Sequence, residues 1–187
     1  MGQGFESLRA HHVAVNPVKR DEKYMRVALE LAEEAYKAGE IPVGAVIVSD
    51  DTIIARARNE KELRNDATAH AELTALQQAA QSLGRWRLSD ATLYCTLEPC
   101  AMCAGAMVNA RLGRLVYGAG DSKAGAAGSI LDVVRFPGLN HQIQVYAGVL
   151  EADCARLLSE FFADLRRDGR VGRRRSTRNV VRNVEDM

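Results

Sequence analysis

The spacing of apolar residues predicts that the chain opens with a helix followed by two strands. Apolar side chains recur every three or four positions between Asp21 and Gly39, the period of an amphipathic helix, with Asp21 as its N-cap and Gly39 as its stop. The run VGAVIVS, residues 43–49, predicts a buried strand, and TIIARARN, residues 52–59, predicts a second strand. Because only an Asp-Asp turn separates the two runs, we expect them to form an antiparallel hairpin.

The rest of the chain alternates between helical and extended patterns. Helices are predicted over residues 68–83, 100–110 and 151–167, and strands over residues 91–97, 114–118 and 142–148. A glycine-rich loop, residues 118–129, separates the last two strands. Strands that are joined by helices pair in parallel, whereas the hairpin is antiparallel. This order predicts an α/β fold, a three-layer α/β/α domain around a five-stranded mixed sheet.

Composition narrows the class of protein. The 187 residues are 47% hydrophobic and 26% charged, which is typical of one soluble globular domain. No apolar run is long enough to span a bilayer, and the first twenty residues lack the apolar stretch of a signal peptide. We therefore predict a cytoplasmic protein without membrane contact, whose four cysteines form no disulfide framework.

The net charge of +1 hides a strongly basic C-terminal end, with eight arginines between Arg166 and Arg182. We predict a globular domain over residues 20–167, a flexible arm over residues 1–19, and a basic, disordered tail over residues 168–187. Two interpretations of this tail stay open. It binds polyanions such as nucleic acid, or it is a solvated segment without a ligand.

Two short motifs contain residues suited to metal chemistry: HAE, which begins at His70, and PCAMC, which holds Cys100 and Cys103. Positions i and i+3 share one helix face, so both sulfurs can reach one point, and the electropositive start of a helix favours thiolates. Two thiolates and one imidazole form the ligand set of a zinc site whose fourth position is open to water. A redox-active cysteine pair is the rival interpretation, which the accompanying HAE disfavours.

Glu72 is the predicted catalytic carboxylate. Residues i and i+2 of a helix face different ways, so Glu72 is badly placed to bind the metal that His70 binds, and well placed to reach a water on it. Zinc with two thiolates is formally neutral, and hydroxide formation therefore needs a nearby base. Glu72 is predicted to be that base and to return the proton to the substrate.

The combined pattern H-x-E…P-C-x-x-C is the known signature of zinc-dependent nucleobase deaminases. Over residues 24–167 the chain also resembles the bacterial tRNA-specific adenosine deaminases of the cytidine-deaminase-like superfamily. The resemblance is carried by GEIPVGAVIV, ATAHAE, ATLYCTLEPCAMCAGAMVNARLGRLVYGA and DSKAGAAGS. The loop DSKAGAAGS, the stretch TLEPCAMCAGA and the FF…RR end narrow the match to the tRNA enzymes.

This resemblance implies a cytidine-deaminase-like fold and the hydrolytic deamination of adenosine to inosine at the wobble position (34) of tRNA anticodons. It implies that water on one zinc ion per subunit attacks C6 of a flipped adenine, while Glu72 shuttles protons. By the same resemblance, Asn59 contacts the base and Asp121 contacts the RNA near the target nucleotide. The implied assembly is a homodimer that binds the anticodon stem-loop.

Several alternatives stay open. Asn59 is also a residue type that commonly ends strands, and Asp121 is one that commonly forms turns. The nearest alternative function is deamination of a free base or nucleoside such as cytosine, cytidine or guanine. A zinc-bearing RNA-binding subunit without activity is a third, which the presence of Glu72 disfavours.

Overall fold

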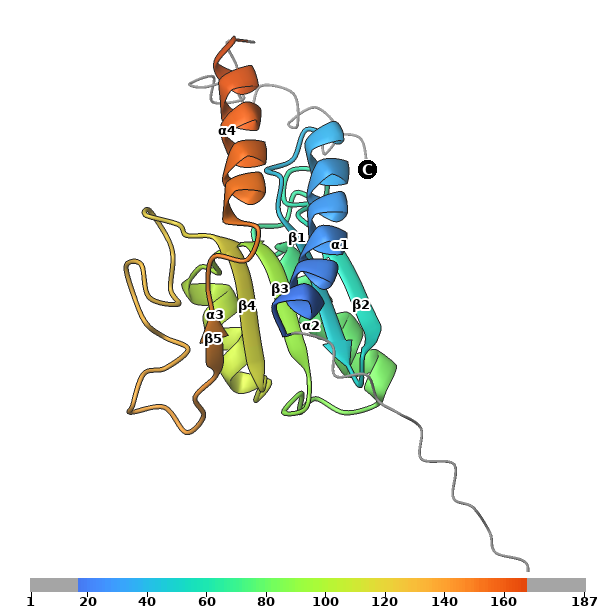
Figure 1. Ribbon diagram of the computed structural model, residues 1–187, viewed down its shortest axis with the longest axis vertical. Coiled ribbons are helices and arrows are strands. Elements are labelled where there is room, and N and C mark those ends of the chain that lie inside the picture. Colours follow the sequence, from blue (N-terminus) through green and yellow to red (C-terminus); the bar gives the residue numbers. More distant parts are fainter. Residues whose placement is uncertain (1–16, 168–187) are drawn as a thin grey trace, which may run out of the picture.

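The computed structural model describes residues 17–167, which form nine helices and strands (Figure 1). Most of the predicted arm and the whole arginine-rich tail lie outside the described residues. In chain order the elements are α1 (Pro17–Lys37), β1 (Gly44–Ser49), β2 (Thr52–Arg58), α2 (Ala71–Leu83), β3 (Thr92–Leu97), α3 (Ala101–Asn109), β4 (Arg114–Ala119), β5 (Gln144–Tyr146) and α4 (Glu151–Arg167).

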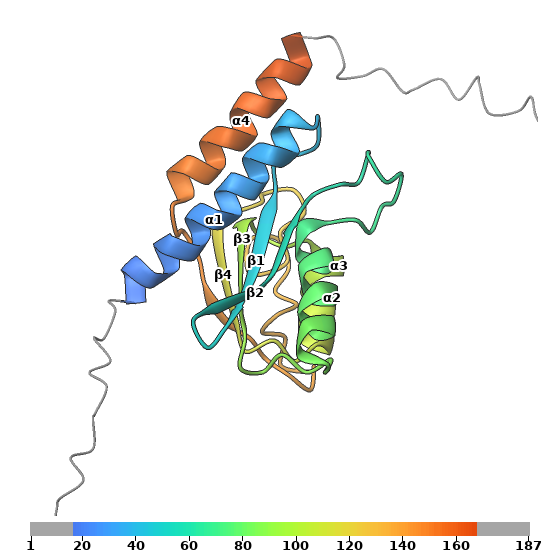
Figure 2. The ribbon, with the colours of Figure 1, turned by 90° about the vertical axis from the view of Figure 1, so that its right-hand side faces the viewer.

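The predicted three-layer α/β/α fold around a five-stranded mixed sheet is confirmed. The strand order is β2-β1-β3-β4-β5, in which β1 is antiparallel to β2 and β3, while β3, β4 and β5 are parallel. Figure 2 shows α1 and α4 on one face of the sheet, here called the outer face, and α2 and α3 on the opposite, inner face. Both faces of the sheet are therefore covered by helices.

Two apolar cores result from this layering, and β1 contributes to both. Ala45 and Ile47 pack in the inner core beneath α2 and α3, whereas Val46 and Val48 pack in the outer core against α1. This alternation follows from the period of two in a strand. All six residues of β1 are buried, which explains why its sequence is a continuous apolar run rather than an alternating one.

Helix starts differ from the prediction more than helix ends do. Gly39 and Gly84 follow α1 and α2 with φ values of +80° and +62°, a left-handed conformation that stops a helix. The predicted capping role of Asp21 is wrong, because α1 already begins at Pro17. The helix predicted from residue 68 begins at Ala71, because Thr68 donates to the side chain of Asp66 in a turn that precedes it.

The last strand is shorter than predicted. It spans only Gln144–Tyr146 instead of residues 142–148. The backbone N–H of Ile143 donates to the carbonyl of Val134 rather than to a neighbouring strand, and Gly148 turns away with φ +83°. Both ends of the predicted run therefore leave the sheet.

Asp21, which does not cap α1, connects this helix to the sheet within the outer layer. It is 6% exposed and accepts two hydrogen bonds from the guanidinium of Arg114 at 2.8 and 2.6 Å, and one from the hydroxyl of Tyr94 at 2.9 Å. Burial alone raises the pKa of Asp21, but the hydrogen bonds and charge of Arg114, with the bond from Tyr94, lower this pKa below its usual value. We call these three residues the outer-face cluster.

Within residues 17–167, no helix combines the length and the apolar character that crossing a membrane requires.

Candidate active site

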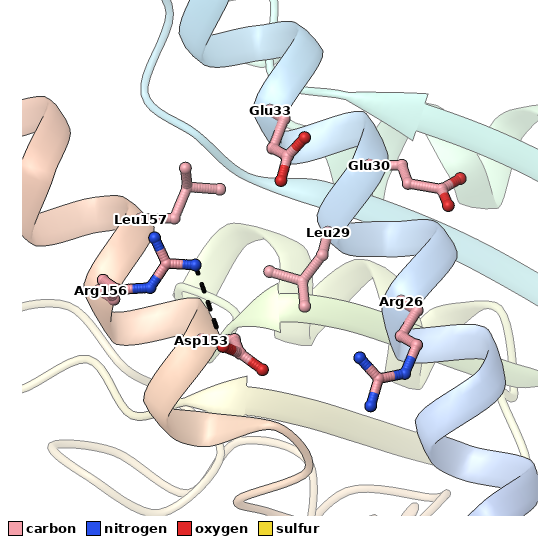
Figure 3. A pocket seen from close by; sticks show the side chains of 7 residues that line it. All are labelled: Arg26, Leu29, Glu30, Glu33, Asp153, Arg156 and Leu157. Carbon is pink, nitrogen blue, oxygen red and sulfur yellow. Dashed lines mark ion pairs between the residues drawn. The ribbon is translucent and has the colours of Figure 1, made fainter.

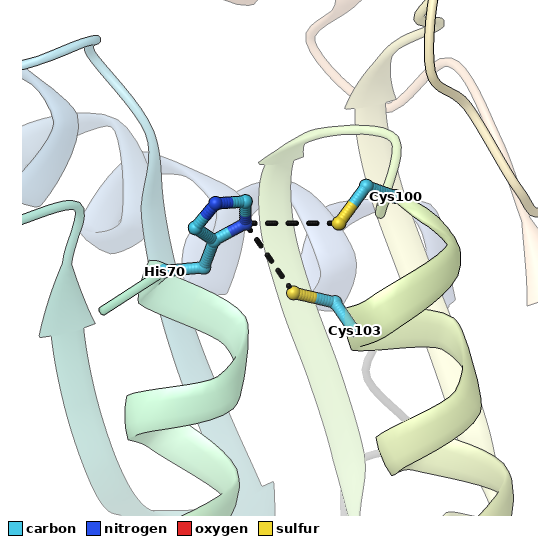
Figure 4. Close-up of side chains that lie close together, drawn as sticks. All are labelled: His70, Cys100 and Cys103. Carbon is cyan, nitrogen blue, oxygen red and sulfur yellow. Dashed lines mark hydrogen bonds between the residues drawn. The ribbon is translucent and has the colours of Figure 1, made fainter. Parts of the chain in front are cut away.

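Three predicted metal ligands meet where two inner-face helices begin. His70 is the N-cap of α2 and Cys100 the N-cap of α3, both with extended backbone, and Cys103 lies in the first turn of α3. The Nδ1 atom of His70 lies 3.7 Å from Sγ of Cys100 and 3.6 Å from Sγ of Cys103 (Figure 4). All three ligand atoms lie within 4.8 Å of one another, and they form the one group within residues 17–167 that could hold a metal ion.

The electrostatics of this group favour a bound cation. Hydrogen bonds from Cys103 and His70 lower the pKa of Cys100 to about 3, so this sulfur is a thiolate at neutral pH. The bond that Cys103 donates to Cys100, together with burial, raises the pKa of Cys103, and the bond to Cys100 raises the pKa of His70. The three groups thus share protons around one negative charge. A bound metal ion would take the place of these protons.

Glu72 lies beside the three ligands as the second residue of α2, and it is 4% exposed. Burial raises the pKa of Glu72, and the nearby charge of His70 and a hydrogen bond from Cys103 only partly oppose this effect. No lysine or arginine of the described chain forms an ion pair with it. A buried carboxylate without a fixed cation exchanges protons more readily than a salt-bridged one.

A cavity of about 190 Å³ opens next to the ligands. It is lined by Ile41, Val43, Asn59, Lys61, His70, Glu72, Leu97, Glu98, Cys100, Asp121 and Ala124. The structure therefore brings together the predicted catalytic residue, two of the predicted ligands and both predicted substrate contacts around one space. Cys103, the third predicted ligand, does not line the cavity and is fully buried.

One wall of the cavity comes from the residues that follow β2. Asn59 is the first residue after this strand, and its Nδ2 donates to Oε2 of Glu40 at 3.0 Å. The backbone N–H of Leu63 donates to Oε1 of Glu40 at 2.6 Å. Asn59 thus ends a strand and also lines the cavity, so the two interpretations of this residue do not exclude each other.

Another part of the lining comes from the glycine-rich loop that follows β4. Oδ1 of Asp121 accepts from the backbone N–H groups of Lys123 and Ala124, at 2.8 and 3.2 Å, which forms the turn expected of such a residue. Asp121 is half-buried and lines the cavity as well. Again the turn and the position at the cavity occur together.

Three polar residues at or beside this cavity, Glu40, Lys61 and Glu98, received no functional role from the sequence. The hydrogen-bond partners of the two carboxylates, Glu40 and Glu98, lie 19 to 31 residues away along the chain. Glu98 immediately precedes PCAMC, and this adjacency was the one local signal available. Lys61 is half-buried at the cavity and adds a positive charge there.

A second depression lies on the outer face and differs in chemistry. It has a volume of about 300 Å³ between α1 and α4, and its lining is Arg26, Leu29, Glu30, Glu33, Asp153, Arg156 and Leu157 (Figure 3). Arg156 in this lining forms ion pairs, at 3.9 Å from Asp153 and 3.1 Å from Glu160. The depression has no metal-binding group and no unpaired buried acid, so the inner-face cavity is the candidate active site.

Comparison with known proteins identifies the class. Residues 19–166 match the family model of the MafB19-like deaminases. A guanine deaminase from Nitrosomonas europaea has a similar structure, with 27% identity and a TM-score of 0.66 over 84% of this chain and 99% of that chain. Fold and site together therefore define a deaminase, with the cytidine-deaminase-like fold that the resemblance implied.

More similar relatives narrow the family. The tRNA-specific adenosine deaminase of Bacillus subtilis is 45% identical over 83% of this chain and 96% of its own length, and that of Haemophilus influenzae is 47% identical over 81% and 88%. A solved tRNA:A34 deaminase, studied for A-to-I editing at the wobble position of transfer RNA, is 44% identical, with a TM-score of 0.70 over 73% of this chain and 99% of that chain. This chain belongs to the family of tRNA-specific adenosine deaminases.

Proposed function

We propose that this protein hydrolyses adenosine to inosine at the wobble position of a tRNA anticodon, using a zinc ion. The observation that carries the proposal is one cavity with a His/Cys/Cys group, a buried unpaired carboxylate and two polar loop residues. The family membership supplies the substrate, because the relatives named above are tRNA-specific adenosine deaminases.

The ligand group fits zinc. With Zn–S bonds of about 2.3 Å and Zn–N bonds of about 2.0–2.1 Å, tetrahedral zinc separates a sulfur ligand from a nitrogen ligand by about 3.6 Å. The two Nδ1–Sγ distances in the protein are 3.7 and 3.6 Å. When bound by His70, Cys100 and Cys103, zinc would lower the pKa of a water molecule and thereby supply the nucleophile.

Glu72 moves the protons in this proposal. Its carboxylate takes a proton from the attacking water and delivers it to the leaving amino group, so that a C–O bond forms at C6, the C–N bond breaks and ammonia leaves. A raised pKa suits a group that must hold the proton between these two steps. Glu98, the carboxylate that precedes the motif with Cys100 and Cys103, does not compete for this role, because it uses both of its oxygens in hydrogen bonds.

Asn59 and Asp121 would orient the substrate. The bond to Glu40 fixes the side-chain amide of Asn59, so its remaining polar groups meet the base in a defined direction. Asp121 keeps one carboxylate oxygen outside the turn that it forms. Lys61 contributes a cation of the kind that binds phosphates.

The test is a synthetic anticodon stem-loop with adenosine at the wobble position, incubated with zinc-loaded protein and assayed for inosine by mass. We expect inosine at that position alone. Guanine, cytosine and cytidine belong in the same assay, because a guanine deaminase shares the fold. Faster turnover of a free base than of the stem-loop would overturn the RNA substrate and leave the deaminase chemistry in place.

The homodimer and the cytoplasmic location stay predictions. Sedimentation of the zinc-loaded protein tests the former, and a sedimenting mass of a single chain would contradict it.

A further inference from the structure

Glu98 is a buried carboxylate for which the proposed reaction has no use. It follows β3 directly, is 2% exposed, and no lysine or arginine within the described residues pairs with it. Every hydrogen bond that it accepts comes from the glycine-rich loop. Oε1 accepts from the backbone N–H groups of Ala127 at 2.9 Å and Ser129 at 3.0 Å. Oε2 accepts from the backbone N–H of Asp121 at 3.0 Å and from the hydroxyl of Ser129.

The loop is built around this carboxylate. A Cβ atom at Gly125 would lie 2.4 Å from Oε2 of Glu98, so the backbone approaches the carboxylate more closely than any other residue type permits. Burying a carboxylate is unfavourable unless its oxygens are satisfied, and here four donors from one loop satisfy them. These four hydrogen bonds therefore attach the loop to Glu98.

One of the four donors belongs to Asp121. Its N–H donates to Glu98 while its side chain lines the cavity, so a single residue connects the buried carboxylate to the cavity wall. Since both oxygens of Glu98 are already engaged, Glu98 offers a substrate no free acceptor.

We infer that Glu98 is a positioning residue, which sets the place of Asp121 at the cavity and through it the binding of the RNA substrate. This inference rests on the proposed function. Glu98 acts on binding and leaves the proton transfers of Glu72 unchanged.

The substitution Glu98→Gln tests the inference by replacing one carboxylate oxygen of Glu98 with an NH2 group. The amide oxygen can keep the bonds from Ala127 and Ser129 N–H, which puts the NH2 group in place of Oε2. The hydroxyl of Ser129 can reverse and accept from this NH2, whereas the N–H of Asp121 cannot. The substitution therefore orphans the Asp121 N–H and keeps the remainder of the loop bonded.

We expect Glu98→Gln to raise KM for the anticodon stem-loop about tenfold, from the loss of one bond to a charged acceptor, with kcat changed less than about threefold. Zinc content stays as in the wild type. Hydrogen exchange of peptides covering residues 120–130 becomes faster, and this readout needs no substrate. Glu30→Gln, an exposed carboxylate on α1, is the matched control and leaves KM and exchange unchanged.

A double-mutant cycle separates positioning from general stabilisation. If Glu98 acts through Asp121, then Glu98→Gln adds little to KM in an Asp121→Ala background. Independent, multiplying effects would overturn the inference, and so would unchanged loop exchange. If Glu98→Gln fails to fold, Ser129→Ala removes only the hydroxyl contact, and we expect a rise of KM of about twofold to threefold with faster exchange at Asp121.

Failure of the proposed function gives a different result. Wild-type protein that forms no inosine overturns the RNA substrate, while the exchange measurement still decides whether Glu98 holds the loop.

Discussion

The outer-face cluster and the inner-face cavity each contain a buried acid near the start of a helix, and the two acids differ in their partners. Asp21 is 6% exposed and Glu72 is 4% exposed. Asp21 binds the guanidinium of Arg114 with both oxygens, and its pKa is lowered. Glu72 has no such cation, and its pKa is raised. Burial alone therefore does not identify a functional acid: Glu72 lies beside the proposed metal ligands and has a raised pKa, whereas the ion pair of Asp21 lowers its pKa.

The largest effect is expected from a substitution that removes a proposed metal ligand of the inner-face cavity. We expect Cys103→Ser to abolish zinc binding and turnover together, because a serine hydroxyl is a poor zinc ligand and Cys103 is a proposed ligand together with His70 and Cys100. Metal content by atomic emission and inosine formation are the measurements. Cys154→Ser is the control, because this thiol is buried in the outer core, whereas Cys103 is buried in the inner core. Normal zinc content in Cys103→Ser would contradict the ligand assignment.

The next largest effect is expected at Glu72, where a substitution separates proton transfer from metal binding. We expect Glu72→Gln to lower kcat by about 10³-fold, within the range for loss of a general acid–base group. Zinc content and stem-loop affinity should be retained. Thermal unfolding should occur at the same temperature or higher, because a neutral amide removes the burial penalty that raises the pKa of Glu72. Unchanged turnover would refute its role in proton transfer.

Asp21→Asn should have the opposite profile. We expect a loss of about 2–3 kcal/mol in the free energy of unfolding, because it removes a hydrogen-bonded charge and leaves Arg114 without its partner. The value of kcat should remain within about twofold of the wild type. Asp90→Asn breaks the exposed pair with Arg85, and we expect it to lose less than about 1 kcal/mol. Equal losses in the two variants would show that the outer-face cluster has no special role.

The smallest expected effect is the pH dependence of the stability difference between the wild type and Asp21→Asn. Because the folded pKa of Asp21 is lowered, its ionisation stabilises the fold fully above the unfolded value of about 3.9, and this contribution is lost as pH falls through the folded pKa. The stability difference between wild type and Asp21→Asn should therefore be constant near neutral pH and shrink below about pH 4. Urea unfolding at several pH values measures it. A difference that grows on acidification would contradict the lowered pKa.

The layers of the fold were predictable because their signals are local. Apolar runs and periods marked every strand and helix, and stop glycines such as Gly39 and Gly84 marked helix ends. The cluster of His70, Cys100 and Cys103 was predictable for a related reason, since each motif is short and combines residue types that serve zinc. Only the meeting of the two motifs in space required the fold.

The partners of buried acids were not predictable, because they depend on tertiary contacts. Asp21 and Arg114 lie 93 residues apart in the chain, so Asp21 was misread as a helix cap. Glu98 and Ser129 lie 31 residues apart, and neither has a local pattern that reveals the other. Sequence periodicity reports which side of an element is apolar, and it says nothing about which polar groups will satisfy each other across elements.

The positions of the three ligands along the chain also bear on folding. His70 precedes Cys100 and Cys103 by 30 and 33 residues. An ion held by all three would close a loop that contains α2 and β3, and closing a loop of this size restricts the unfolded chain much as a disulfide does. The helices α1 and α4 lie outside this loop, near the two ends of the described chain. The ion would therefore cross-link the segment from α2 through β3 to the start of α3, and the outer helices α1 and α4 would have to rely on their own packing.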